Sequence, residues 1–372
     1  MSARHGEIAS TVCGLLEEGV RQGVFPGAVA AIGRLAEPRP VCVLARAGVL
    51  APGEREVVLD TPYDLASLTK PFVALTALRL AQQRQLDLHA PIADVLEELA
   101  GTPGGESTLA ELLSHRAGLA PWGPLYAQLP GPAGSPEARA FMLREAATRL
   151  DASYGKRESV YSDFGYLLAG ETLARGARLR LDALVRREVT APLGIEARVR
   201  YAASLAPDAR RDLAERAAPT EHDPHRGRLA RGEVHDENCF AFGGIAGHAG
   251  LFGDAQSVLT FGLSLLAALE GQPSFVDQAI LRWALTPRGP GYLVGFDQRS
   301  AEGSSAGALF SPRAFGHLGF TGTSLWCDPP RRLCAVLLTN RVHPTRENIA
   351  IRSFRPRFHD AVATLALALG GD

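Results

Sequence analysis

The chain has 372 residues, of which 46% are hydrophobic and 21% charged, and its net charge is −1. This composition is that of an ordinary water-soluble globular protein, and the near-zero charge does not indicate a nucleic acid or an acidic membrane surface as a partner. The length suits one large domain or two, and no run of 18 apolar residues predicts a membrane span.

The N-terminal stretch predicts an amphipathic helix, whose buried face is expected to consist of Ile8, Val12, Leu15 and Leu16. Its glutamates and the lack of a long apolar run distinguish it from a secretory signal. Two strand-like runs follow, at 27–35 and 41–49, separated by the turn-forming AEPRP. A helix that begins at Ser67 is predicted next.

The middle of the chain, from about residue 80 to 235, is mainly helical in pattern, and its polar stretch 219–238 is expected to be an ordered loop. Near the end, 314–328 and 332–342 predict two strands joined at PPR, and a last helix is expected over about 357–369. Strands therefore lie at both ends of the chain, with helices between them.

This order of elements predicts an α/β (α+β) fold with one antiparallel sheet built from both chain ends and flanked by the terminal helices. A mostly helical region is inserted in the middle. We expect a single catalytic domain over 1–372, with an α/β part at about 1–75 and 240–372 and a helical part at about 76–239. The site is expected between the two parts, where clefts usually form.

The cysteines, Cys13, Cys42, Cys239, Cys327 and Cys334, are odd in number and form no CxxC motif. A disulfide framework is therefore not expected, and free thiols in a reducing cytosol fit better. Cys327 and Cys334 flank the expected hairpin turn, so a bridge between them is the less favoured alternative. Free thiols and the missing signal together predict a cytoplasmic protein.

The stretch YDLASLTKPF, residues 63–72, places Ser67 and Lys70 three positions apart at the start of an apolar helix. One interpretation is structural: a serine caps the helix, Pro71 is tolerated in the first turn, and the lysine is an ordinary surface residue. The other is chemical. Residues three apart share a helix face, so the Lys70 amine reaches the Ser67 hydroxyl, and a buried lysine with a lowered pKa removes the serine proton.

Two further stretches bear on this choice. VYSDFGYLLAG places Tyr161 in a loop before a helix, with Asp163 at the expected N-cap, although a loop tyrosine alone is normally a packing residue. GHLGFTGTS, residues 316–324, carries His317 in a glycine-rich strand pattern, which indicates a bulged edge strand or close approach of a ligand or another backbone. The glycine-dense GGIAGHAGLFG lacks the GK[ST] ending of a phosphate loop.

Together these stretches resemble the three sequence boxes of the serine β-lactamase and penicillin-binding-protein superfamily. The boxes are S-x-x-K at Ser67–Lys70, Y-x-[ND] at Tyr161–Asp163 and [KH]-x-G at His317–Gly319. The tyrosine of the second box is similar to the class C β-lactamase, DD-peptidase and esterase branch. YDLASLTK, LLSHRAGL and GHLGFTGTSLW also look like one bacterial subgroup of these serine hydrolases, and the resemblance runs from about residue 20 to about 365.

The resemblance implies a role for each box residue. Ser67 would be the nucleophile that forms an acyl-enzyme, and Lys70 would stabilise the alkoxide and move its proton. Tyr161 would be the partner base and the proton donor to the leaving group. Asp163 stands where asparagine is common, and we expect its charge to raise the pKa of Lys70 and shift the role of base to Tyr161. The N–H groups of Ser67 and Phe320 would form the oxyanion hole.

The third box departs from the Lys-Thr-Gly of the family. His317 can be neutral near pH 7, and Leu318 lacks the hydroxyl that would hold a substrate carboxylate. Thr321 and Thr323, further along the expected strand, are candidates to replace it. Penicillins and D-Ala-D-Ala peptides carry that carboxylate, so weak or absent β-lactamase activity is expected. The predicted function is hydrolysis of a small ester, amide or cell-wall-derived peptide through acyl-Ser67.

Two other function classes stay open. One is a metal-dependent hydrolase, whose ligands would come from His222, His225, His235, Asp236, Glu237 and His248, although no HExxH motif occurs. The resemblance instead implies that VHDEN and GHAG line or brace the substrate cleft. The other is a non-catalytic module that binds muropeptides.

The resemblance places the loop before Trp122 near the rim of the cleft, with Tyr126 close by, and His115 is interpreted as structural. No cofactor, metal, nucleic acid or membrane is predicted as a partner. The expected partner is a small-molecule or peptide substrate, and the oligomeric state is not predicted.

Overall fold

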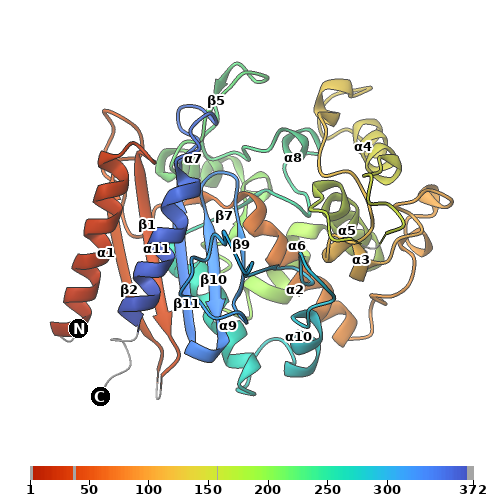
Figure 1. The fold of residues 1–372 in the computed structure, drawn as a ribbon. Helices are drawn as coiled ribbons and strands as arrows, with labels where there is room; N and C mark the ends of the chain where they lie inside the picture. Colours follow the sequence, from red (N-terminus) through yellow and green to blue (C-terminus); the bar gives the residue numbers. More distant parts are fainter. Residues whose placement is uncertain (1–2, 37–38, 157, 367–372) are drawn as a thin grey trace.

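The computed structural model describes residues 3–36, 39–156 and 158–366. Its centre is a six-stranded antiparallel sheet in the order β2-β1-β11-β10-β9-β8 (Figure 1). In that order the strands are Val41–Gly48, Gly27–Arg34, Leu333–Thr339, Ser324–Asp328, Phe315–Leu318 and Asp297–Gln298. The predicted sheet from both chain ends is confirmed, because β1 pairs with β2 on one side and with β11, from the other end of the chain, on the other side.

Shorter strands form two small sheets outside this one. The sheet β3-β7-β4 joins Tyr63–Asp64, Leu251–Gly253 and Arg200–Tyr201, and the hairpin β5-β6 joins His222–Asp223 and Arg228–Leu229. The segment 219–238 thus contains a short hairpin where only an ordered loop was predicted.

Eleven α-helices are found in the described residues. They are α1 Ala3–Arg21, α2 Thr69–Gln82, α3 Leu109–Leu113, α4 Pro136–Thr148, α5 Asp163–Gly176, α6 Leu181–Val185, α7 Pro207–Arg216, α8 Glu237–Ala241, α9 Ala255–Leu269, α10 Gln278–Ala284 and α11 Ile351–Ala366. The last helix begins six residues earlier than predicted, and the predicted positions 367–369 lie outside the described residues. No helix of the described residues is long and apolar enough to cross a membrane.

The two faces of the sheet bury different layers of helices. Alternate residues of β1 point to opposite faces: Ala28 and Ile32 pack with α1 and α11, whereas Val29 and Ala31 belong to the core on the α9 side. In α1 the buried stripe is Ile8, Val12 and Leu16, which are four apart; Leu15 is only partly buried, contrary to the prediction, because it falls beside this stripe. Figure 1 shows α1 and α11 side by side, far from α4 and α5.

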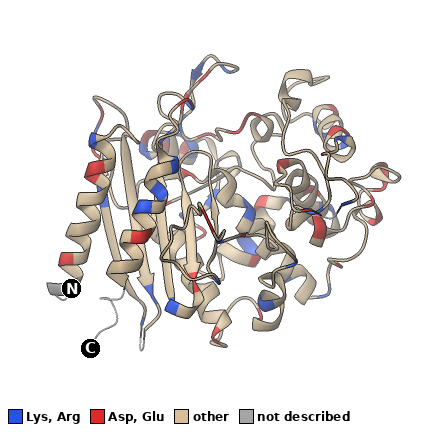
Figure 2. Ribbon diagram, in the orientation of Figure 1, with Lys and Arg blue, Asp and Glu red and all other residues tan. Residues whose placement is uncertain are grey.

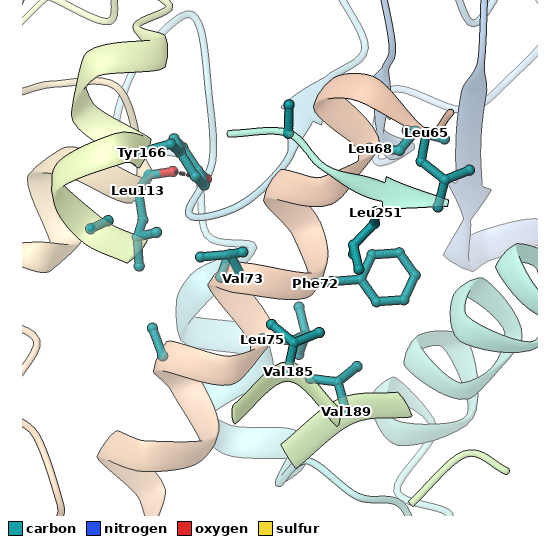
Figure 3. Packing of buried hydrophobic residues seen from close by; sticks show 14 of the residues in the cluster. Leu65, Leu68, Phe72, Val73, Leu75, Leu113, Tyr166, Val185, Val189 and Leu251 are labelled. Atoms are coloured by element: carbon teal, nitrogen blue, oxygen red, sulfur yellow. Dashed lines mark hydrogen bonds between the residues drawn. The ribbon is translucent and has the colours of Figure 1, made fainter. Parts of the chain in front are cut away.

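Helix α2 runs between the sheet and the helical part. Nearly every residue from Thr69 to Leu80 is buried, because the helix is packed on all sides. Figure 3 shows Phe72 and Leu75 of this helix against Val185, Val189 and Leu251. One hydrophobic cluster thus runs through both parts of the chain, and the single catalytic domain over 1–372 stays a prediction.

A tight hairpin near the C-terminus replaces the long strand predicted over 314–328. Strands β9 and β10 pair in antiparallel fashion, and a turn over residues 319–323 joins them. The sequence pattern missed this turn because residues on both sides of it are strand formers. Cys327 and Cys334 face each other in the next pair of strands with their Sγ atoms 3.5 Å apart, and both are free thiols.

Charged side chains of both signs are interspersed over the helices and loops (Figure 2). This distribution agrees with the net charge of −1.

Candidate active site

Ser67 lies in a strained turn that presents its hydroxyl. A 3₁₀ turn, Ala66–Leu68, connects β3 to α2, and Ala66 has a φ of +47°, in the left-handed region that disfavours side chains. The Asp64 carboxylate holds this conformation: one oxygen accepts from the Ala66 N–H at 2.8 Å and the other from the His235 N–H at 2.6 Å. Ser67 does not cap α2, contrary to one sequence interpretation, because Leu68 occupies that position.

The Ser67 hydroxyl is shared between two other side chains. Lys70 Nζ donates to Ser67 Oγ at 2.8 Å, and Tyr161 OH lies 2.6 Å from the same atom. Lys70 Nζ also donates to Tyr161 OH at 2.5 Å. The first two sequence boxes therefore meet in a closed triangle of polar atoms, although 91 residues separate Lys70 from Tyr161.

Lys70 is fully buried and has four oxygen neighbours. Besides the triangle, its Nζ donates to Asp163 Oδ1 at 2.6 Å and to the His248 carbonyl at 3.2 Å. Burial lowers the pKa of Lys70, and the Asp163 carboxylate offsets only part of this effect. The Asp163 charge thus acts in the direction expected from the sequence, but burial outweighs it, and the net lowering is that of the buried lysine in the chemical interpretation.

Tyr161 precedes α5, whose N-cap is Ser162 rather than the predicted Asp163. The Ser162 hydroxyl accepts from the N–H of Gly165, which leaves the Asp163 carboxylate free to face Lys70. His115 steadies the loop: its Nδ1 accepts from the Ser162 N–H at 2.9 Å, and its ring lies 4.7 Å from that of Tyr161.

The pKa of Tyr161 is raised well above its usual value, first by burial and then by the nearby Asp163 charge. His317 does not supply a compensating cation, because burial and the Lys70 charge lower its pKa to about 3. The role of Tyr161 as the partner base therefore stays a prediction.

The third box closes the site from the edge of the sheet. His317 Nδ1 donates to the Leu318 carbonyl at 2.8 Å, which leaves Nε2 as the acceptor of the neutral ring. Gly319 packs directly against the Ser67 turn: a Cβ there would lie 2.6 Å from the Leu65 carbonyl oxygen and 2.0 Å from Thr323 Oγ1. Only glycine fits this close approach.

The two threonines after the box do not replace the missing hydroxyl of Leu318. Thr321 Oγ1 donates to the Asp64 carbonyl at 2.8 Å, and Thr323 Oγ1 donates to the Leu65 carbonyl at 3.1 Å. Both residues are buried and tie the β9-β10 turn to the Ser67 turn. They lie in a turn and not along a strand, so the alternation on which the prediction rested does not apply.

These groups open into a cavity of about 550 Å³. Its walls include the predicted residues Ser67, Trp122, Tyr161, Asp163, His317, Gly319 and Phe320. Sequence reasoning missed another set of lining residues: Tyr292, Asp297, Arg341, Arg346, Arg352 and Arg355. No local motif marks them, because the pairing of β8 with β9, the loop after β11 and the start of α11 bring them to the cleft.

The His- and Asp-rich segment divides into separate pairs. His248 Nε2 lies 2.9 Å from Asp236 Oδ1, and His235 Nε2 lies 3.4 Å from Glu221 Oε2. His222 and His225 are exposed on the β5-β6 hairpin. Among the residues described, no three His, Cys, Asp or Glu side chains are grouped so that they could share a metal ion. His235, Asp236 and Glu237 instead line the cavity.

Comparison with known proteins agrees with this geometry. The family model described as Beta-lactamase matches residues 13–355. A "Putative D-alanyl-D-alanine carboxypeptidase" from Salmonella agona (strain SL483) is 27% identical over 310 residues, 76% of this chain and 70% of that protein. An N-acetylmuramyl-L-alanine amidase from Bacillus subtilis (strain 168) is 29% identical over 305 residues, 76% of this chain and 68% of that protein.

A solved structure, that of EstCE1, a hydrolase with promiscuous acyltransferase activity, has the same fold. It superposes with a TM-score of 0.74 at 21% identity, covering 97% of this chain and all of the other. The fold and the site define a protein of the serine β-lactamase and penicillin-binding-protein superfamily, as the sequence predicted. The chain belongs to the Beta-lactamase family.

Proposed function

We propose that the protein is a serine hydrolase that acts through an acyl-Ser67 intermediate on a small ester, an amide or a cell-wall-derived peptide. The observation that carries this proposal is the triangle of Ser67 Oγ, Lys70 Nζ and Tyr161 OH, with edges of 2.5 to 2.8 Å. A nucleophile within hydrogen-bond reach of two proton-transfer groups is the arrangement that acyl transfer requires.

In the first step, the Ser67 proton passes to Lys70 Nζ while Oγ bonds to the substrate carbonyl carbon. Lys70 is the better base of the two candidates, because its pKa is lowered while that of Tyr161 is raised. The oxyanion would accept from the N–H groups of Ser67 and Phe320. Tyr161, as a phenol, donates its proton to the leaving oxygen or nitrogen as the bond to carbon breaks, and regains one from Lys70. A water molecule then hydrolyses the acyl-enzyme by the reverse proton path.

The relatives and the third sequence box both support the proposed substrate class. Relatives named as a carboxypeptidase and an amidase favour a peptide or amide of cell-wall origin. His317 is neutral, and the threonine hydroxyls that could replace a Lys-Thr-Gly threonine are bonded to backbone carbonyls. Weak or absent β-lactamase activity therefore stays our prediction, and so does a cytoplasmic location.

Hydrolysis of p-nitrophenyl acetate and butyrate, with and without a strong chelator, tests this function. Wild-type activity that ignores the chelator and disappears in Ser67→Ala is the expected result. Activity that survives in Ser67→Ala but disappears with the chelator would favour the metal-dependent hydrolase with ligands in the 222–248 segment. Binding of muropeptides without turnover of esters, amides or peptides would favour the non-catalytic module.

A further inference from the structure

One carboxylate in the cavity has no part in the triangle. Asp297 begins the edge strand β8 and lines the same cavity as Ser67. It is partly buried, and no basic side chain within the described residues forms an ion pair with it. Burial raises the pKa of Asp297 to about 6, and the Gln298 N–H offsets part of that effect. The other cavity-lining carboxylates, Asp163, Asp236 and Glu237, all have cationic or histidine partners.

The surroundings of Asp297 suit a cation. Tyr292 forms an antiparallel bridge with Asp297, and its partly buried side chain lines the cavity. A carboxylate beside an aromatic ring binds an ammonium group by charge attraction and by cation–π contact. A neutral hydrogen-bond donor would gain only a hydrogen bond to the carboxylate, without the charge attraction and without the cation–π contact.

The register of β9 sets this carboxylate apart from the arginines of the cleft. Asp297 pairs with Gly316, whereas Arg355 donates to the Gly319 carbonyl and Arg341 donates to the Phe320 carbonyl. Gly316 and Gly319 are three residues apart, which is roughly 10 Å along an extended chain. Asp297 therefore pairs with the residue before His317, whereas the two arginines bind carbonyl groups of residues that follow it.

We propose that Asp297 is a specificity-determining residue that binds an ammonium group on the substrate of the Ser67 reaction. The inference rests on the proposed acyl transfer at Ser67. It narrows the substrate to esters, amides or peptides that carry a free amine in reach of the Asp297 end of the cleft.

The test uses pairs of p-nitrophenyl esters that differ only in having a terminal ammonium in place of a methyl group. The pairs are β-alaninate with butanoate, 6-aminohexanoate with heptanoate, and 8-aminooctanoate with nonanoate. Each kcat/KM is divided by the rate of spontaneous hydrolysis, so that the reactivity of the ester is removed. Wild type, Asp297→Asn and Asp297→Ala are compared with Asp94→Asn, which removes an equal charge from an exposed position.

We expect wild type and Asp94→Asn to prefer the cationic ester roughly tenfold for at least one chain length, as one charge-assisted contact provides. Both Asp297 variants should lose this preference while keeping their rates on the neutral esters, which also shows that they fold. No preference at any length in wild type, or a preference that persists in both Asp297 variants, would overturn the inference. Ser67→Ala separates the two proposals: neutral esters hydrolysed at the wild-type rate by that variant would overturn the proposed function itself.

Discussion

The Lys70 ammonium nitrogen lies 2.6 Å from Asp163 Oδ1 inside a site where the lysine is fully buried. Two opposing effects therefore act on the pKa of Lys70. Burial lowers the pKa of Lys70, and the carboxylate raises it, with burial the larger effect. The lowered pKa of Lys70 and the raised pKa of Tyr161 support the proposal that Lys70 takes the Ser67 proton.

Replacing Asp163 with asparagine tests this balance. Asn keeps an oxygen that accepts from Lys70 Nζ but removes the charge that raises the pKa of Lys70. The pKa of Lys70 should then fall further, so the neutral amine exists at lower pH. We expect the acidic limb of the kcat/KM profile for p-nitrophenyl butyrate to move to lower pH in Asp163→Asn. A limb that stays in place, or moves to higher pH, would show that Lys70 is not the titrating base.

Tyr161→Phe separates proton transfer from substrate contact. The phenol oxygen lies 2.6 Å from Ser67 Oγ and 2.5 Å from Lys70 Nζ, so its loss removes the proton donor without removing the ring. We expect kcat to fall roughly 10²- to 10⁴-fold with little change in KM. Steady-state kinetics on p-nitrophenyl butyrate measures both constants. An unchanged kcat with a sharply raised KM would make Tyr161 a contact residue.

Gly319→Ala probes the contact between the third box and the Ser67 turn. The new Cβ would lie 2.6 Å from the Leu65 carbonyl oxygen, so the turn must shift and take the Phe320 N–H with it. A misplacement of about 1 Å is expected to lower kcat/KM roughly 100-fold. Gly14→Ala, where nothing lies within 4 Å of the added Cβ, is the matched control. Equal activities of the two variants would mean that this turn does not position a catalytic group.

Asp297 should make the protein less stable near neutral pH. Its pKa is about 6 in the folded protein and about 3.9 in an unfolded chain, so the folded state binds the proton more tightly. The free energy of unfolding therefore falls as the pH rises from about 4 to 6, by about 1–3 kcal/mol.

Asp297→Asn should consequently be more stable than wild type at pH 7, and the difference should shrink toward zero near pH 4. Denaturant unfolding at the two pH values measures this difference. A gain in stability that does not depend on pH would show that repacking, rather than charge, separates the two proteins.

The parts of this account that could be predicted from the sequence depend on local spacing. Ser67 and Lys70 are three residues apart, and a helical turn brings such residues together wherever the helix lies. The sheet from both chain ends followed from strand patterns at 27–35 and 332–342. The sequence could not show which of the two effects on the pKa of Lys70 is larger, because the burial of the lysine depends on the tertiary fold.

The cleft residues that were missed depend on long-range pairing. Asp297 reaches the cavity only because two residues of β8 pair with β9, and a strand of that length leaves no clear pattern in a sequence. Thr321 and Thr323 were assigned to a strand because their neighbours are strand formers, whereas the glycines at 319 and 322 permit a turn. The roles of Asp297, Thr321 and Thr323 depend on where the fold places them, and local sequence patterns do not give that position.

Labelling with a fluorophosphonate, followed by peptide mapping, tests most directly whether Ser67 is the nucleophile. This probe phosphonylates an activated serine irreversibly, so no acyl-enzyme needs to accumulate. We expect one modified site, in the peptide that contains Ser67. Hydrolysis of p-nitrophenyl butyrate should be lost in proportion to the labelling. Modification of another serine, with full hydrolysis retained in Ser67→Ala, would contradict this role of Ser67.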